Sequence, residues 1–555
     1  MDAPQLKRIL DGRELAKALG VKPGKWTGQA LDVCVAWQLR NPDKTDPTPA
    51  IEEVQKQRKE LGDRKMNAEE LLGSDNQSRL KLLAKDAIPA ESVQNSLASE
   101  DASLRRDAAL ILLGRALEKA PVLENSTLID ALAKTLKAPS VQEGTDTFAA
   151  ATAAEAVLAA LYSFNAEAEI IQNDVLLNTI PYSQTSQAWT TQVAASVAER
   201  LLKRYLPGEK KQEFIIGDIL QGYLRPIFSK STSSVTAEGR PALFREPSPE
   251  GGFHAQKAAW KDAGLHVVAI FEWAVQSSEP ATMKKHWPLY VPVLVTLTED
   301  NDVAIRQRGI DILNVFLTKC PADILRTSGI DSVFQESIFP SLLFLPALTP
   351  EAESVTLLRS AYRTLLTLAV ADSDPAGKKR RALLDKMLRD GVLAGYFHAS
   401  QHIRVVEVLM QSVAQIVETL QIYTVKHLSS LLDLFTPVLT DAFALAYAPA
   451  VIAAAKALNI VILNCWPRVV GTPHAEQIIN IVSRCWTNIH DADNGNANSD
   501  LNILAEELKQ TMSLLASLWA ESDEPLPKEK LASIVKEAPH LEPLFAPFQL
   551  GKSAA

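Results

Sequence analysis

Two histidines four residues apart are the first candidates for chemistry in this 555-residue sequence. His398 and His402 stand in the stretch HASQH, and on a single helix this spacing would put both imidazoles on one face, where zinc could bind. The glutamate that would act as a base in such a motif is replaced by Ala399, and no third ligand is evident. We therefore favour a packing or surface pair, and we expect no metal site, no cofactor and no catalytic residue.

Four cysteines form a second candidate set, and none of them has CxxC spacing. Each stands in an apolar, helical context, which predicts reduced, buried thiols in an intracellular protein and argues against zinc. The N-terminal run MDAPQLKRIL lacks the apolar stretch of a signal peptide, and we find no run of about 18 apolar residues that could span a bilayer. We expect a soluble protein without membrane contact. The cysteines are Cys34, Cys320, Cys465 and Cys485.

Composition favours an elongated array of helices. Apolar residues make up 47% of the chain but aromatic residues only 6%, so the apolar mass is Leu, Ala, Val and Ile, which fill helix-on-helix interfaces. With 23 glycines the chain has little room for glycine-rich phosphate loops. The net charge of −9, with dispersed Lys and Arg, provides no footprint for nonspecific binding to a phosphate backbone, so nucleic acid is an unlikely partner.

Hydrophobic periodicity predicts helices throughout, because apolar residues recur at three-four spacing and alternation at period two is nowhere sustained. In DVAIRQRGIDILNVFL the apolar stripe includes Ile305 and Leu313, and we expect Arg306, Arg308 and Asp311 to turn mainly toward its flanks and water. Similar stripes run through residues 104–116, 406–417 and 454–465. The chain is therefore predicted to be all-α.

Two of these stripes share a longer pattern that indicates a repeat. An Asp precedes each helix, and an apolar residue, an Arg, a small residue and a Leu follow at the same offsets. The pattern resembles the second helix of a HEAT repeat, in which the Asp caps helix amides and the small residue lets a neighbouring helix approach. A chance match of amphipathic helices is the alternative. The two sets are Asp101, Leu104, Arg105, Ala108, Leu112 and Asp302, Ile305, Arg306, Gly309, Leu313.

Segment boundaries follow from breaks in the pattern. A helix pair cannot bury its apolar stripe alone and must pack on the next pair, so we expect a HEAT-like helical-repeat solenoid with on the order of ten pairs. Shorter breaks fall at 136–147 and 490–500. The predicted parts are a small helical segment at 1–62, a connector at 63–79, N-terminal HEAT-like repeats at 80–224, a long surface loop at 225–254, C-terminal HEAT-like repeats at 255–548 and a disordered tail at 549–555.

From about residue 222 onward, four ordered blocks resemble the fungal form of the second Tel-two-interacting protein family. His286, Trp287 and Pro288 lead into a helix, an acidic turn and the Arg-containing helix with Asp302, Arg306 and Gly309. The run FLPALTPE, with Leu345 and Pro346, matches the family's Leu-Pro-x-Leu-Thr-Pro block, and FHASQHIRVVEVL fits the helix that follows. The resemblance covers about residues 75–548 and is sharpest between 222 and 415.

The resemblance implies a non-enzymatic scaffold made of α-solenoid repeats. Members of that family join Tel-two and the first Tel-two-interacting protein in the TTT complex, a co-chaperone that works with HSP-ninety and R2TP in the assembly of PI-kinase-related kinases. It also implies links to TOR signalling, the DNA damage response and telomere maintenance, and a cytoplasmic and nuclear location. In the family the C-terminal half binds the first Tel-two-interacting protein, which places the partner surface within residues 255–548 without identifying individual contact residues.

The first 62 residues carry a different resemblance. Gly20 to Trp26 (GVKPGKW) and Trp37 to Pro42 (WQLRNP) are similar to the C-terminal tail of fungal CCA-adding tRNA nucleotidyltransferases, which helps hold the tRNA elbow. A gene fusion, a gene model that merges neighbours and a tail reused as a folding cap all remain open. The resemblance implies possible tRNA contact by residues 1–62 only.

The chain does not carry the rest of that enzyme. The two metal-binding carboxylates after a Gly-Ser loop, which would hold Mg²⁺, are missing. Arg105, Arg106 and Asp107 mimic the enzyme's nucleotide-reading triplet, but they fall within the HEAT-type pattern, so solvated helix charges are favoured.

Three further features have competing readings. Trp287 could anchor a partner, although packing against the following turn is favoured. Arg306 and Arg308 could contact a partner's carboxylates, although an exposed helix charge more often contributes nothing measurable. The run from Lys378 to Arg381 could be a nuclear-import signal or a solvated helix start. The rivals to the TTT scaffold are a tRNA-binding protein that acts through residues 1–62 and a generic HEAT-repeat adaptor.

Overall fold

The predicted all-α fold is confirmed in the computed structural model. The regular elements of the described residues are helices, and no strand occurs among them. The structure describes residues 15, 17–18, 31, 34–35, 37–38, 46–51, 54, 68–83, 90–117, 125–136, 147–164, 171–185, 187–228, 259–262, 264–371, 374, 377–492 and 499–549. Most of the predicted loop at 225–254, the break at 137–146 and residues 550–555 of the predicted tail lie outside these ranges.

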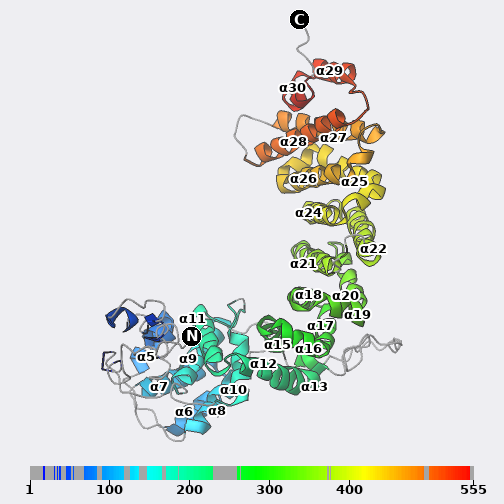
Figure 1. Ribbon diagram of the computed structural model, residues 1–555. Coiled ribbons are helices and arrows are strands. Elements are labelled where there is room, and N and C mark those ends of the chain that lie inside the picture. The colour runs from blue at the N-terminus through cyan, green and yellow to red at the C-terminus, as the bar shows by residue number, and fades with distance from the viewer. Residues whose placement is uncertain are drawn as a thin grey trace. The chain divides into compact units, whose positions relative to one another are not determined.

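The chain divides into two compact units. Unit 1 comprises residues 1–219 and 261–273, and unit 2 comprises residues 220–260 and 274–555. The division at residues 219 and 220 falls inside the π-helix η2 (Ile215–Leu224), close to the end of the predicted N-terminal repeats at residue 224. Each unit buries apolar side chains of its own, and both units consist of helices (Figure 1).

In unit 1 the helices pack around α9, whose sequence TFAAATAAEAVLAALYSF is rich in alanine. Small side chains let neighbouring helices approach closely, and α9 contacts α7, α8 and α11. The helices of unit 1 are α4 (Ala68–Leu71), α5 (Ser74–Leu83), α6 (Ala90–Leu97), α7 (Ala102–Leu117), α8 (Asn125–Thr135), α9 (Thr147–Phe164), α10 (Asn173–Thr179), η1 (Ile180–Tyr182), α11 (Gln192–Tyr205), α12 (Glu209–Phe214) and the first part of α15 (Leu265–Ser277).

A buried carboxylate ties the helices of unit 1 together. Glu155 on α9 is 3% exposed, and its Oε1 accepts hydrogen bonds from the Gly73 amide at 2.7 Å and from Asn76 Nδ2 at 2.9 Å. Its Oε2 accepts from Thr191 Oγ1 at 2.5 Å. Thr191 in turn caps α11 by accepting from the Ala194 amide. These bonds compensate the cost of burying the carboxylate and join α4, α5, α9 and α11.

The described residues of the N-terminal segment form a small core of their own. Leu15, Cys34, Ala50 and Val54 are buried together, with the side chains of Leu31, Trp37 and Ile51 packed against them. Asp46 accepts hydrogen bonds from the amide and the hydroxyl of Thr48, and these bonds lower the pKa of its carboxyl. Residues 15–54 therefore contain helical positions with a shared apolar centre, as the sequence predicted for a small helical segment.

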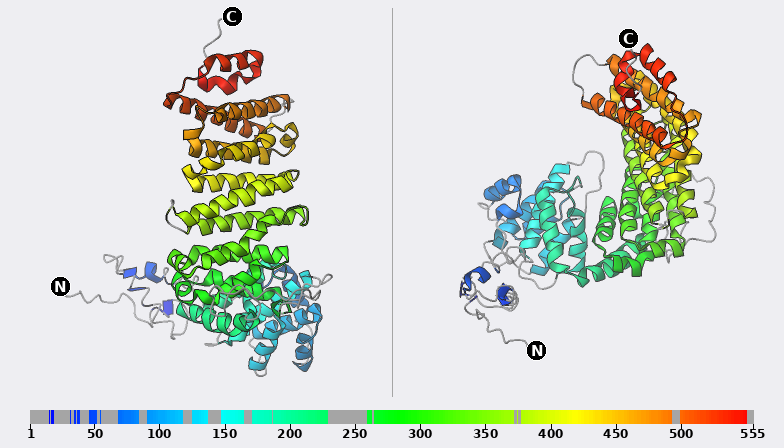
Figure 2. Two further views of the ribbon diagram at one scale, coloured as in Figure 1. Left: turned by 90° about the vertical axis from the view of Figure 1, so that its right-hand side faces the viewer. Right: turned by 45° about the horizontal axis from the view of Figure 1, so that its top comes forward.

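Unit 2 is a stack of helix pairs. The second helices of successive pairs pack on one another, α18 on α21, α21 on α24, α24 on α26 and α26 on α28, and the layers follow one another along the unit in chain order (Figure 2). The first helices are α17 (Val291–Thr298), α20 (Ile330–Ile338), α22 (Lys378–Lys386) with η5 (Met387–Leu393) and α23 (Ala394–Ala399), α25 (Leu428–Thr440) and α27 (Pro473–Ala492). The second helices are α18 (Val303–Lys319), α21 (Glu351–Val370), α24 (Ile403–Leu420), α26 (Ala448–Cys465) and α28 (Ser499–Glu521).

The remaining helices of unit 2 are short. They precede the first pair, connect successive pairs, or follow the last one. They are α13 (Arg225–Phe228), α14 (Ala259–Asp262), α16 (Pro280–His286), η3 (Trp287–Leu289), α19 (Ala322–Ser328), η4 (Phe339–Leu343), η6 (Gln421–His427), η7 (Ala442–Tyr447), η8 (Trp466–Arg468), α29 (Lys528–Glu537), η9 (Pro539–Leu541), α30 (Glu542–Phe545) and η10 (Ala546–Phe548).

Side-chain hydrogen bonds between layers show that stacked helices run parallel. Arg363 donates to Asp311, and Thr367, one turn later, donates to Asn314. Residue numbers therefore increase in the same direction along α18 and α21. Gln477 donates to Asp433 and Asn488 donates to the Thr440 carbonyl, which gives the same result for α25 and α27. Parallel stacking is the arrangement of a helical-repeat solenoid, and that prediction is confirmed.

Three segments correct the expectation that no part of the chain is long and apolar enough to span a bilayer. Thr147–Phe164, Ile403–Thr440 and Ala442–Arg468 meet that criterion by length and composition. The most apolar windows of these segments are 67%, 61% and 61% buried inside the structure. The helices of these segments pack against α7, α21, α25 and α28. A helix with neighbours on several sides can be apolar around most of its circumference.

Two local features of the helices differ from expectation. Residues 225–228 fall in the predicted loop at 225–254 but form the helix α13, and the Phe228 ring stacks on Trp260 with centroids 5.8 Å apart. Leu104 is 47% exposed, although it was predicted to lie on the apolar stripe of its helix.

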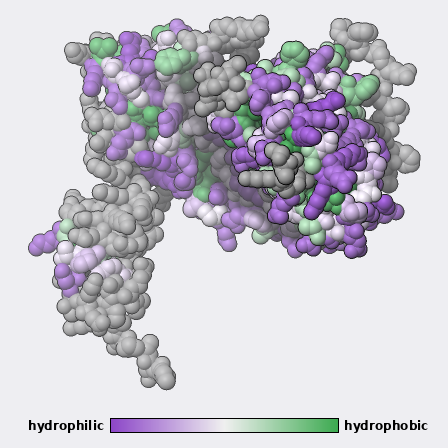
Figure 3. All heavy atoms as spheres, turned by 90° about the horizontal axis from the view of Figure 1, so that it is seen from above, coloured by the Kyte–Doolittle hydropathy of each residue, from purple (hydrophilic) through white to green (hydrophobic). Residues whose placement is uncertain are grey.

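Unit 2 is closed at its C-terminal end by helices with a polar outer surface. The surface seen from that end is mainly hydrophilic, with scattered apolar side chains (Figure 3). Terminal repeats of a solenoid have no neighbour on their outer side, so a polar outer surface keeps them soluble.

Candidate functional site

The residues of the HEAT-like pattern come together at the turn before α18. Asp302 Oδ1 accepts hydrogen bonds from the amides of Ala304 at 2.9 Å and Ile305 at 3.0 Å, so it caps the helix. The Asp302 amide donates to Asp300 Oδ1 at 2.8 Å. Gly309, about two turns further along, lies against α17, where an added Cβ would be 2.7 Å from Leu297 Cβ. The helix pair is held together at this turn by a cap and by close packing.

Arg306 is buried, which corrects the expectation that it turns toward water. The residue is only 6% exposed; its Nε donates to the Asp300 carbonyl at 2.7 Å and its Nη2 to the Glu299 carbonyl at 3.1 Å. Burial lowers the pKa of the guanidinium, and the charges of Asp300 and Glu299 oppose that shift. Arg306 therefore stabilises the turn before its own helix and does not present its charge to a partner.

The same arrangement recurs in unit 1. Asp101 Oδ1 accepts from the Ser103 amide at 2.8 Å, and the Asp101 amide donates to Ser99 Oγ at 3.1 Å. Arg105 Nη1 donates to the Ser99 and Glu100 carbonyls, each at 2.9 Å. Two helices about 200 residues apart in the sequence thus begin with an Asp cap and an Arg bound to turn carbonyls, which argues against a chance match of amphipathic helices.

Arg306 also fixes the following repeat. Its Nη1 donates to Ser341 Oγ at 3.2 Å, and its Cζ lies 4.6 Å from the ring centroid of Phe344. Leu345 is 7% exposed, and its carbonyl accepts from the amides of Leu348 and Thr349, each at 3.1 Å. Pro346, which follows Leu345 directly, is half-buried. Arg306 therefore links the turn before α18, which carries Asp302, to the segment before α21, which carries Leu345 and Pro346.

An exposed apolar row lies on three successive turns of unit 2. Leu348 is 96% exposed, Phe397 80% and Phe443 89%. Leu348 lies shortly before α21, Phe397 lies on α23 shortly before α24, and Phe443 lies on η7 shortly before α26. Because these second helices stack on one another and neighbouring helices pack about 8–10 Å apart, their starts gather along one edge. We call Leu348, Phe397 and Phe443 the turn row.

Polar contacts hold the turns that carry this row. Glu407 is 8% exposed; its Oε1 accepts from Gln411 at 2.8 Å, and Arg359 lies 3.4 Å from the same atom. Its Oε2 accepts from the Tyr447 hydroxyl at 2.8 Å, and this hydrogen bond raises the pKa of Tyr447. Glu407 thus links α21, α24 and the end of η7.

His286, Trp287 and Pro288 lie elsewhere, around the short helix η3 at the start of α17. All three are half-buried, so Trp287 is neither a fully buried staple nor a fully exposed anchor. Partial burial lowers the pKa of His286, and the charge of Lys285 lowers it further. The motif leads into Tyr290, which is buried and shares a 2.7 Å hydrogen bond with Ser278. These residues do not join the cluster around Arg306.

The two histidines of HASQH do not share a helix. The helix α23 ends at Ala399 and α24 begins at Ile403, so His398 belongs to one helix and His402 precedes the other. His398 is exposed, and its ring packs edge-on against Phe397 with centroids 5.1 Å apart. Among the described residues no group of three or more His, Cys, Asp and Glu is placed to hold a metal ion.

The cysteines are buried and free, as predicted. Burial raises the pKa of Cys320, Cys465 and Cys485, each to about 12, and it also raises the pKa of Cys34. A thiol with so high a pKa is protonated at neutral pH and is a poor nucleophile. These four residues therefore contribute to packing.

The residues that resemble a nucleotide-reading triplet face three different structural partners. Arg105 binds the turn carbonyls described above, and Arg106 Nε donates to Asn76 Oδ1 at 2.5 Å. Asp107 accepts two hydrogen bonds from Arg79, with Nε at 2.9 Å and Nη2 at 2.5 Å. All three side chains hold α7 to neighbouring segments.

Sequence comparison matches two parts of the chain to two different groups of proteins, and the first group is the nucleotidyltransferases. One curated relative, the nucleotidyltransferase lcsQ of Purpureocillium lilacinum, is 75% identical over 61 residues, which are 11% of this chain and 10% of that protein. The mitochondrial CCA tRNA nucleotidyltransferase of Saccharomyces cerevisiae is 45% identical over 42 residues, 8% of each chain. The chain thus spans about a tenth of the length of these relatives. No solved structure matches.

The other match covers the region with the Arg306 cluster and the turn row. The model of the Tti2 family matches residues 175–446, which include Asp302, Arg306, Leu348, Phe397 and Phe443. Residues 175–446 of this helical-repeat chain are therefore a Tti2-family region, which confirms the resemblance over that stretch.

Proposed function

We propose that this chain is a non-catalytic scaffold subunit of the TTT complex that binds the first Tel-two-interacting protein through unit 2. The match of residues 175–446 to the Tti2 family carries this proposal. The remaining expected partners are the Tel-two protein, the HSP-ninety and R2TP machinery and the PI-kinase-related kinases that they assemble. A cytoplasmic and nuclear location, with roles in TOR signalling, the DNA damage response and telomere maintenance, belongs to the same proposal.

The turn row is the surface that we assign to the first Tel-two-interacting protein. Large apolar side chains that are 80–96% exposed have no function in the fold of unit 2, because they bury almost no area there. A stable interface buries upward of about 1,200 Å² around apolar anchors, and three such side chains on adjacent turns can provide a centre.

Co-purification tests the proposed membership. Affinity-tagged full-length chain is expressed in its host cell, and the bound proteins are identified by mass spectrometry. Recovery of the Tel-two protein and the first Tel-two-interacting protein in amounts comparable with the bait is expected. Their absence at physiological salt, with the bait folded, would contradict the assignment. Recovery of other partners instead would favour a generic HEAT-repeat adaptor.

A second candidate function rests on the N-terminal match. The 42-residue stretch that is 45% identical to a CCA tRNA nucleotidyltransferase suggests that residues 1–62 contact tRNA. A gel shift with tRNA at physiological salt compares the full-length chain with a version that starts at residue 63. Binding by the full-length chain alone would support this activity, and equal behaviour of the two proteins would exclude it.

A further inference from the structure

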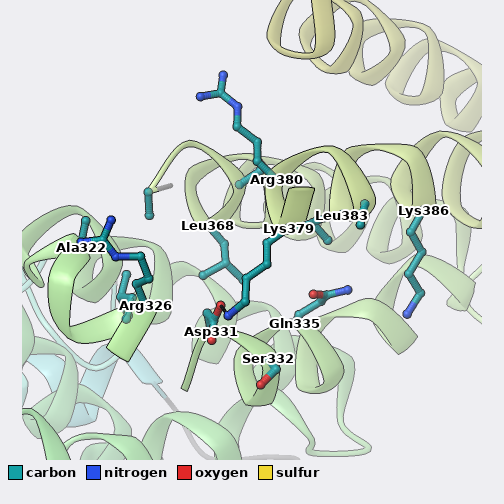
Figure 4. A pocket seen from close by; sticks show the side chains of 14 residues that line it. Ala322, Arg326, Asp331, Ser332, Gln335, Leu368, Lys379, Arg380, Leu383 and Lys386 are labelled. Atoms are coloured by element: carbon teal, nitrogen blue, oxygen red, sulfur yellow. Dashed lines mark hydrogen bonds and ion pairs between the residues drawn. The ribbon is translucent and has the colours of Figure 1, made fainter. Parts of the chain in front are cut away.

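Unit 2 contains a cavity of about 310 Å³ between two successive repeats. It is bounded by α19, by α20, by the last turn of α21 and by α22 (Figure 4). It includes part of the basic run from Lys378 to Arg381 and none of the turn-row residues.

The floor of this cavity is apolar. Leu325 is 2% exposed, and Leu368 and Leu383 are each 6% exposed. Alanines 322, 369, 371 and 382 also line it, so most of the wall offers no hydrogen-bonding group. Water finds few hydrogen-bond partners on such a floor. An apolar group of a ligand would therefore displace that water with a favourable free energy.

The rim carries an excess of positive charge. Arg326 is exposed at one side of the cavity, Lys379 crosses its middle, and Lys386 stands at the opposite side (Figure 4). Lys386 lies over the Phe339 ring, with its Nζ 4.1 Å from the centroid. Asp331 is the acidic residue among those that line the cavity, and its Oδ2 is 3.1 Å from Lys379 Nζ.

Not all of the basic run serves the cavity. The Arg380 guanidinium points away from it and donates to the Thr419 carbonyl at 3.3 Å (Figure 4). Arg381 lies over the ring of Tyr423, with its Cζ 4.4 Å from the centroid. Lys379, partly balanced by Asp331, is thus the residue of the run that faces a ligand, together with Arg326 and Lys386 from outside the run.

We propose that this cavity binds a short acidic peptide segment of a partner protein. An aliphatic side chain of that segment enters the apolar floor, and flanking Asp or Glu carboxylates pair with Arg326, Lys379 and Lys386. The side-chain amide of Gln335, which can both donate and accept, is available to the peptide backbone. Binding of such a segment goes beyond the proposed scaffold role and does not depend on it.

The chemistry of the cavity favours a peptide over other anions. Inorganic phosphate would pair with the cations but leave the leucine floor in contact with water. Nucleic acid needs a longer basic track and usually aromatic side chains for base stacking. No aromatic side chain is among the described residues that line the cavity, and the chain carries a net charge of −9. An acidic, leucine-containing segment matches both the floor and the rim.

Fluorescence anisotropy with purified full-length chain tests the proposal. The probe is a labelled array of seven-residue peptides in which Leu, Ile, Met, Val or Phe is flanked on both sides by two Asp or Glu. Matched arrays replace the acids with Asn and Gln, or the central residue with Gly. Saturable binding of the acidic array, weakened roughly five-fold or more by either replacement, is expected.

Charge variants locate the site. Arg326→Glu combined with Lys379→Glu should weaken binding by at least about ten-fold, whereas Asp331→Asn, which releases Lys379, should strengthen it. Arg468→Glu on η8, exposed and outside the cavity, reverses a charge without touching the site and should leave binding unchanged. Circular dichroism verifies that all variants are folded.

Four outcomes would overturn the proposal. These are no saturable binding of the acidic array, equal binding of the uncharged array, equal binding of the glycine array together with displacement by inorganic phosphate, or unchanged binding in the Arg326 and Lys379 double variant. Because the assay uses peptides and none of the proposed partner proteins, failure here would leave the co-purification result unaffected.

Discussion

Gly309 has no space for one added carbon, which makes it the sharpest test of packing at the scale of a single residue. A Cβ there would lie 2.7 Å from Leu297 Cβ and 2.8 Å from the Leu297 carbonyl carbon, and backbone cannot move away as easily as a flexible side chain. Gly309→Ala should therefore lower the free energy of unfolding by about 1–3 kcal/mol, despite the better helix propensity of alanine.

Urea denaturation followed by circular dichroism measures this change. Gly217→Ala is the control, because a Cβ at Gly217 meets nothing within 4 Å. That variant should be neutral or slightly stabilising. Equal stability of Gly309→Ala and the original chain would show that α17 and α18 are not in such close contact.

The buried cysteines make stability depend on pH in the alkaline range. Burial raises the folded-state pKa of Cys465 and Cys485 to about 12 from an ordinary value of 9.0. Above pH about 9 the unfolded chain loses thiol protons that the folded chain keeps, so stability falls as the pH rises from about 9 toward 12. Below pH about 9 these thiols make no pH-dependent contribution.

Thermal unfolding between pH 7 and 11 checks this prediction. Cys485→Ala removes one of the thiols, so the decrease in melting temperature between pH 9 and 11 should be smaller in that variant than in the original chain. Labelling of native protein with a thiol reagent at pH 8 should also be slow and should become fast on unfolding. Rapid labelling of the native chain would contradict the burial of these residues.

At the scale of elements, Arg306 connects two helix pairs that the sequence alone does not relate. It binds the turn before α18 and also Ser341 and Phe344 of the next repeat. Arg306→Met keeps the length of the side chain but leaves the Asp300 and Glu299 carbonyls without this donor. We expect a loss of about 2–4 kcal/mol in unfolding free energy.

Arg363→Met provides a matched comparison. The Arg363 side chain is 58% exposed and pairs with Asp311, whose side chain is 37% exposed, so its loss should cost about 1 kcal/mol or less. Urea denaturation of both variants measures the difference. Similar effects of the two substitutions would mean that the buried arginine is no more important to the fold than a surface ion pair.

The turn row gives a prediction about binding without a change in folding. Replacing Leu348, Phe397 and Phe443 together by Ser should change stability by about 0.5 kcal/mol or less per site, because exposed side chains contribute little to the folded state. Capture of the first Tel-two-interacting protein should fall at least about ten-fold, since apolar anchors usually dominate an interface. Quantitative co-purification measures the loss.

Leu463 and Trp466 serve as the control for this variant. They are 55% and 56% exposed, and they lie at the end of α26 and at the start of η8, away from the turns that carry the row. Replacement of both by Ser should leave capture intact. If this pair abolished capture and the turn-row variant did not, the opposite edge of unit 2 would be the docking surface.

At the scale of the whole molecule, the N-terminal segment and unit 2 should be separable in function. The described residues of the segment share a core of their own around Leu15, Cys34, Ala50 and Val54. Removal of residues 1–62 should therefore leave capture of the first Tel-two-interacting protein unchanged, whereas removal of residues 420–555 should abolish it. Co-purification with each truncated chain tests this pair of expectations, and the opposite pattern would contradict the assignment of the interface.

The longer deletion also affects the fold, and the physical reason lies in the stack. It removes α25 to α30, including α26, whose apolar side packs on α24. The exposed end of the shortened stack could reduce solubility. The turn-row variant, which leaves every helix in place, distinguishes loss of the docking surface from loss of folding.

Several features could be predicted because they depend on neighbours in the sequence. The helical period, the Asp cap at residue 302 and the repeat of this pattern at residue 101 are all local, and the structure shows both caps. Family resemblance likewise depends on ordered local blocks, and the match of residues 175–446 agrees with it. Spacing alone does not show that His398 and His402 belong to different helices, because the end of a helix depends on packing as well as on spacing.

Local patterns suffice to identify an all-α repeat protein with a Tti2-family region and an unrelated N-terminal segment. They do not show that Arg306 is buried, that Leu348, Phe397 and Phe443 lie near the starts of stacked helices, or that a cavity rimmed by Arg326, Lys379 and Lys386 lies between repeats. The difference lies in the separation along the chain between the parts of each feature. Helix formation and capping involve residues within about four positions. The other features join residues of neighbouring repeats, such as Arg306 and Ser341, which are 35 positions apart, and only the stacking of repeats brings such residues together.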